Sequence, residues 1–136
     1  MPSFAVAALF VTACNSTPTE GAPATQPAVD ELAERYVAIR DLHDEVMPAR
    51  GALIRQQRAL RDRQQDPSAA VAYRRLERAD SMMMTWMRTE ISLDSLRASL
   101  SDAEIATHLD RRAAEMQAVD DSMRVSMAFA KTLLAE

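Results

Sequence analysis

Three long stretches of the chain carry apolar residues at intervals of three and four positions. This spacing places apolar side chains on one face of an α-helix. The first stretch begins after Asp30, and its apolar positions are Leu32, Tyr36, Ile39, Leu42, Val46, Ala49, Leu53 and Leu60. Pro48 lies inside this stretch, where proline removes a backbone hydrogen bond and clashes with the carbonyl four residues earlier. The pattern therefore predicts a first helix that is kinked or briefly broken near residues 44–48.

The second stretch begins at Pro67, which suits the first position of a helix, behind Asp66, which suits the N-cap. Its apolar positions are Ala72, Tyr73, Leu76, Ala79, Met82, Met83, Trp86 and Met87. Between Thr89 and Leu100 the pattern weakens, because serine recurs at positions 92, 95 and 99. We therefore expect a second helix followed by an irregular or restarted segment.

The third stretch opens with a capping-box sequence, in which Ser101 and Glu104 stand three residues apart. Its apolar positions are Ile105, Leu109, Ala113, Met116, Val119, Met123, Met127, Ala130 and Leu133. Three amphipathic helices with short connections predict an all-α fold, namely an elongated antiparallel three-helix bundle. The same spacing permits self-association as a coiled coil, so a homo-oligomer stays open.

The N-terminal residues have a different character. Residues 4–13 form an apolar run of ten, shorter than the about 20 residues that span a membrane and similar to the apolar region of a signal peptide. Residues 11–14, Val-Thr-Ala-Cys, resemble a bacterial lipobox. That resemblance implies cleavage before Cys14 and acylation of this cysteine, for example with palmitate. Asn15 follows it, and by the sorting rule of some Gram-negative bacteria this residue favours the outer membrane.

The segment after Cys14 holds three prolines, one glycine and several serine and threonine residues. Such a composition is typical of a disordered tether. The expected organisation is a lipoprotein-type signal segment at 1–13, the acylated cysteine and a flexible linker at 14–28, and a helical bundle at 29–136.

The composition of the chain argues against several classes of function. The net charge of −4 argues against nucleic-acid binding, which needs a basic face. A single cysteine excludes an internal disulfide and a cysteine-based zinc site. The chain has no G-x-S-x-G or S-x-x-K motif for nucleophilic catalysis, and its two glycines are too few for a phosphate-binding loop. We therefore expect no enzymatic activity and no obligatory cofactor.

Two clusters hold the residues best suited to bind a ligand. Residues 42–48, LHDEVMP, place His43 and Met47 on one helix face, and residues 82–87, MMMTWM, surround Trp86 with methionines. Imidazole and thioether ligands suit Cu(I), and a His/Met pair can hold haem iron. The candidate contact or ligand residues are His43, Met47, Met83, Trp86 and Met87, with His43, Met47 and Met87 as the candidate metal ligands. The competing interpretation is that these methionines fill the helical core.

The same two clusters, with residues 108–134 of the last predicted helix, resemble a group of small Gram-negative lipoproteins often labelled "viral A-type inclusion protein". The likeness spans about 100 residues. It implies an acylated N-terminus and a helical domain, but it carries no catalytic role, because the group has no assigned activity. The sequence departs from the group in lacking a basic signal start and in its segment 89–100.

The sequence therefore predicts a cell-envelope lipoprotein, anchored through Cys14 and facing the periplasm from the outer membrane. It would act without catalysis, as a helical interaction or scaffold module with an unidentified envelope protein as its partner. The alternative is a periplasmic copper- or haem-binding bundle built on His43, Met47 and the cluster at 82–87.

Overall fold

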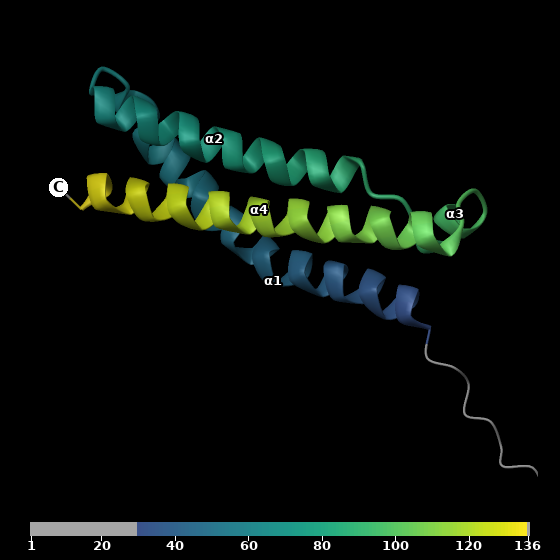
Figure 1. The fold of residues 1–136 in the computed structure, drawn as a ribbon. Coiled ribbons are helices and arrows are strands. Elements are labelled where there is room, and N and C mark those ends of the chain that lie inside the picture. Colours follow the sequence, from purple (N-terminus) through teal and green to yellow (C-terminus); the bar gives the residue numbers. More distant parts are fainter. Residues whose placement is uncertain (1–29, 136) are drawn as a thin grey trace, which may run out of the picture.

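The structure, a computed structural model, describes residues 30–135. Three long helices run up, down and up, and each packs against the other two (Figure 1). The elements are α1 (Glu31–Leu60), the 3-10 turn η1 (Arg61–Arg63), α2 (Pro67–Arg88), the short α3 (Leu93–Arg97) and α4 (Asp102–Leu134). α4 has 33 residues, which corresponds to a length of about 50 Å. Because residues 30–135 contain no strand, the predicted all-α, elongated three-helix bundle is confirmed.

α1 continues through Pro48 without a break. Figure 1 shows its axis changing direction about midway along the helix. Both Pro48 and Asp44, whose carbonyl cannot receive a bond from the proline, are exposed. Water can therefore hydrate that carbonyl, and the helix continues beyond the proline. Of the two predicted outcomes, the kink occurs and the break does not.

The helix ends follow the local signals of the sequence. Asp66 accepts a hydrogen bond from the backbone N–H of Ser68 at 2.8 Å, with Pro67 in the first turn. After α2 the chain leaves the helix and restarts at α3, whose N-cap Ser92 accepts a bond from the backbone N–H of Ser95 at 3.2 Å. The predicted restarted segment between the second and third long helices is therefore confirmed.

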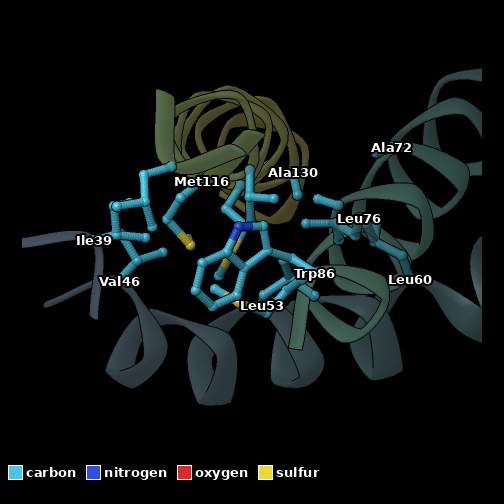
Figure 2. Packing of buried hydrophobic residues seen from close by; sticks show 14 of the residues in the cluster. Ile39, Val46, Leu53, Leu60, Ala72, Leu76, Trp86, Met116 and Ala130 are labelled. Carbon is cyan, nitrogen blue, oxygen red and sulfur yellow. The ribbon is translucent and has the colours of Figure 1, made fainter. Parts of the chain in front are cut away.

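The core is one continuous cluster between the three long helices. Alanines at positions 69, 72 and 79 are fully buried on α2, so that the helix backbones can approach each other closely. Larger side chains from all three helices fill the space around them, and the fully buried ones are Leu53, Leu60, Leu76, Met83, Ile105, Leu109, Met116 and Met123. Figure 2 shows side chains of α1, α2 and α4 meeting around Trp86.

Among residues 30–135, no helix is long and apolar enough to cross a membrane. The predicted lipidation site Cys14 and the predicted segments 1–13 and 14–28 lie outside the described residues.

Two carboxyl groups at helix N-termini link stability to pH. A hydrogen bond from Arg97, and then one from the backbone N–H of Ala33, lower the pKa of Asp30. Bonds from the backbone N–H and the hydroxyl of Ser101, at 2.8 and 2.7 Å, lower the pKa of Glu104. Because both folded pKa values lie below the unfolded ones, the stabilisation is fully present above about pH 4 and is lost as the pH falls through the folded pKa values.

We predict that Glu104→Gln and Asp30→Asn each lower the free energy of unfolding at pH 7. In both variants the free energy of unfolding should then fall less between pH 7 and pH 3 than it does in the wild type. Urea unfolding followed by circular dichroism at both pH values measures the effect. Glu77→Gln, at an exposed position in the middle of α2, is the matched control. The prediction would be contradicted if the free energy of unfolding fell by as much between pH 7 and pH 3 in the Glu104 and Asp30 variants as it does in the wild type.

Candidate functional site

One indole ring connects the three long helices. The His43 ring of α1 stacks on Trp86 of α2, with ring centroids 5.3 Å apart and an interplanar angle of 14°. Arg112 of α4 places its Cζ atom 4.2 Å from the indole centroid, within cation–π range. The indole Nε1–H also donates a hydrogen bond to the backbone carbonyl of Arg112 at 3.2 Å. Trp86 therefore fixes how α1, α2 and α4 sit against one another near the end of α2.

Arg112 is a charged residue inside the bundle, and only 6% of it is exposed. Its guanidinium donates to the backbone carbonyl of Trp86 at 2.8 Å, to the Thr89 hydroxyl at 3.1 Å and to the Glu115 carboxylate at 2.9 Å. The carbonyl of Trp86 belongs to the last turn of α2, where it also accepts hydrogen bonds from the backbone N–H and the hydroxyl of Thr89, at 3.2 and 3.1 Å, and where a positive charge is favourable. Arg112 therefore caps the C-terminus of α2 from the neighbouring helix.

His43 has one satisfied and one unsatisfied ring nitrogen. Its Nδ1 lies 2.9 Å from a carboxylate oxygen of Asp44. Its Nε2 is buried, and no group within residues 30–135 forms a hydrogen bond with it. Stacking on Trp86 explains the position of the ring but leaves this nitrogen unexplained.

A groove of about 700 Å³ lies between α2 and α4, a volume within the range of ligand-binding sites. Its lining extends from Arg78 to Thr89 along α2 and from His108 to Val119 along α4, which corresponds to about 16 Å on each helix. The apolar part of the lining comes from Met82, Trp86, Ile91, Ala118 and Val119. Most of the surface is therefore apolar, and the groove is open to solvent along its length.

The charged residues of this groove are mostly positive. Arg78, Arg111 and Arg112 line it together with a single carboxylate, that of Glu115. Burial, and then the charges of Arg111 and Arg112, lower the pKa of His108, which favours its neutral form. Its Nδ1 lies 3.0 Å from the guanidinium of Arg111. Three arginines against one glutamate give the groove a net positive charge.

Two smaller cavities lie near the end of the bundle that carries α3. One, of about 10 Å³, lies beside Trp86 where Glu90 accepts hydrogen bonds from Tyr36 and Arg40, both at 3.1 Å. The other, of about 380 Å³, has a lining that is polar and apolar in equal parts, and its lining residues include Asp30 and Arg97. His43 lines none of the three cavities.

The structure brings together part of the set that the sequence grouped and leaves Met87 at its edge. His43 and Trp86 contact each other, Met83 is fully buried in the core, and Met47 is half-buried against that core. Met87 is 36% exposed, at the edge of the bundle. Within residues 30–135, no three His, Cys, Asp or Glu side chains form a group that could hold a metal ion.

Sequence reasoning missed Arg112 and the α4 side of the groove. Arg112 stands three residues after Leu109 and four before Met116, and both of these are buried. A buried position at that spacing was predictable from the period of the helix, but the sequence interpretation assigned the apolar face to Ala113, because arginine is normally exposed. Ser126 is buried on the same face, where its hydroxyl donates to the backbone carbonyl of Arg75 at 3.3 Å.

No family model, curated protein or solved structure matches this chain. The resemblance to small Gram-negative lipoproteins therefore stays a prediction from the sequence.

Proposed function

We propose that this protein is a lipid-anchored, non-enzymatic interaction module of the bacterial cell envelope, whose α2–α4 groove binds a helix of a partner protein. The observation that carries the proposal is the open, mostly apolar groove with its arginines. A helix laid into it would convert the three-helix bundle into a four-helix bundle, an arrangement that buries apolar side chains on all of its members. Helix-in-groove binding of this type is a recurrent mode of peptide recognition.

The dimensions and charge of the groove define the expected partner. A length of about 16 Å accommodates about three turns of helix, so apolar residues at positions i, i+3 or i+4, and i+7 would contact the floor. Acidic residues beside that apolar stripe would meet Arg78 and Arg111, both of which line the groove. Charge complementarity of this kind raises the association rate and selects against basic partners. The expected partner is therefore a protein with an amphipathic, acidic helix.

The proposed anchor agrees with the position of the groove. The described chain begins at the end of the bundle that carries α3, and the groove occupies the halves of α2 and α4 nearest that end (Figure 1). A lipid on Cys14 would thus hold the groove close to the membrane surface. More than one acyl chain would be needed for stable anchoring. In this proposal the lipid is inserted in the outer membrane, and the protein that it anchors faces the periplasm.

Site-specific photo-crosslinking in intact envelopes tests the groove. We predict that p-benzoylphenylalanine introduced at Ala118, an exposed groove position, forms a cross-link to a partner protein. Mass spectrometry should identify the cross-linked peptide of the partner as part of an acidic helix. The matched control position is Ala38, which is exposed on α1. Arg111→Glu is expected to reduce capture, because it reverses a charge in the groove, whereas Arg58→Glu on α1 is not.

Three other results of the cross-linking experiment would contradict parts of the proposal. Capture that is equal at Ala38 and Ala118 would remove the groove from the proposal. Cross-linking between two copies of this chain would replace the partner with a homo-oligomer. Capture that is unchanged by Cys14→Ala would contradict the anchored module, because the variant cannot be acylated at that position.

A further inference from the structure

The buried Nε2 of His43 is the one feature of the Trp86 region that packing leaves unexplained. An ionised Asp44 carboxylate can only accept a hydrogen bond, so Nδ1 of His43 must carry the proton that faces it. In the neutral imidazole Nε2 then carries the lone pair, and it is buried without a hydrogen-bond partner in residues 30–135. Leaving such an acceptor buried and unpaired is unfavourable. A carboxylate on one ring nitrogen and a free lone pair on the other is the arrangement found in histidines that bind metals.

The register of α1 against α2 identifies the residues near this nitrogen. The two helices are antiparallel, so each step forward on α1 corresponds to a step back on α2. Three contacts fix the register, and they join Arg40 to Glu90, His43 to Trp86 and Arg50 to Asp80. Between the second and third of these contacts, Met47 of α1 lies opposite Met83 of α2. Met47 is also one helical turn from His43, on the same face.

Burial supports this placement. Met83 is fully buried, and Met47 is half-buried and packed against the core. Met87 follows Trp86 by one residue and is 36% exposed, so burial favours Met83 in its place. One imidazole and two thioether side chains thus lie within one helical turn of one another, on facing helices beside Trp86.

We propose that His43, Met47 and Met83 form a Cu(I) site beside the Trp86 ring. Thioether and imidazole ligands favour Cu(I) over the harder divalent ions, and an aromatic face stabilises an adjacent cation. The site contains no carboxylate ligand, which disfavours magnesium, calcium and manganese. A haem would need a slot beside His43, and none of the three cavities is lined by this residue.

Titration of the full-length chain with Cu(I) tests the site. Every sample carries Cys14→Ser, so that the only thiol of the chain does not compete for the metal. Cu(I) is added anaerobically in competition with a chromophoric Cu(I) chelator, and the fluorescence of Trp86, the only tryptophan, is recorded in parallel. We expect one equivalent to bind and to quench this fluorescence, because the ion lies next to the indole. Ag(I), which has similar ligand preferences and no accessible redox step, should quench it equally.

Methionine-to-leucine variants separate ligand loss from unfolding, because this exchange conserves side-chain volume. Met47→Leu and Met83→Leu should each weaken Cu(I) binding by about tenfold or more, at least the loss seen when a supporting group of a metal site is removed. His43→Gln should abolish the quenching. Met84→Leu, one residue from Met83, is the matched control and should bind as the parent does. No quenching at one equivalent, or equal affinity in all three methionine variants, would overturn the proposal.

Discussion

Replacing Trp86 with alanine is expected to lower the free energy of unfolding by about 3–5 kcal/mol, the range for aromatic-to-alanine changes in protein cores. Only 5% of Trp86 is exposed, and its ring contacts residues from all three long helices. The substitution opens a cavity, removes the stack with His43 and leaves the backbone carbonyl of Arg112 without the indole donor. Since small domains are stable by about 5–15 kcal/mol, the variant would lose a large share of its stability.

Urea unfolding followed by circular dichroism measures this loss in a chain that no longer contains tryptophan. Trp86→Phe keeps an aromatic ring but not the indole N–H, so its loss should be smaller than that of Trp86→Ala. Val37→Ala is the matched control, because Val37 is 53% exposed and exposed positions normally change stability by less than about 0.5 kcal/mol. A loss below about 1 kcal/mol for Trp86→Ala would refute the central role of the ring.

Arg112→Met is expected to lower the free energy of unfolding by about 2–4 kcal/mol. Methionine fills part of the space of the arginine stem but provides no donor. The carbonyl of Trp86 would lose its bond to the guanidinium, and the cation–π contact with the indole would disappear. The Glu115 side chain is 46% exposed, so water can hydrate its carboxylate and the lost ion pair contributes little.

Two variants test this explanation. Replacing a buried ion pair by apolar residues is often neutral, but here the Trp86 carbonyl loses its shortest and only charge-assisted hydrogen bond and keeps the two longer ones from the backbone N–H and hydroxyl of Thr89. Arg112→Lys keeps the charge and loses the planar fork, so its stability should fall between those of the wild type and Arg112→Met. Combining Arg112→Met with Trp86→Phe should give a non-additive loss, because the two residues contact each other. Additive losses would show that the guanidinium and the ring act independently.

The sequence by itself determined the helices and their ends, because these depend on neighbours along the chain. The apolar period, the Asp66-Pro67 start of α2 and the pairing of Ser101 with Glu104 involve residues at most four positions apart. The kink at Pro48 was predicted on the same basis. Whether the helix would also break there depended on the exposure of Asp44, which only the folded bundle defines.

The candidate site could be predicted only in part. The sequence placed His43 and Met47 on one face of one helix, and it identified the methionines around Trp86. It could not choose between Met83 and Met87, because that choice depends on which of the two the folded bundle buries. Nor could it place Met47 opposite Met83, because the contacts that fix the register of α1 against α2, such as that between Arg50 and Asp80, join residues thirty positions apart.

The tertiary structure alone decided the environment of Trp86 and the position of the groove. Arg112 reads as a surface residue in the sequence, but its position on α4 faces the end of α2, where backbone carbonyls need donors. The groove likewise combines two helix faces that are far apart in the sequence. Helical periodicity reports which side of each helix is buried, whereas burial of a charge and the shape of a groove depend on what the neighbouring helix supplies.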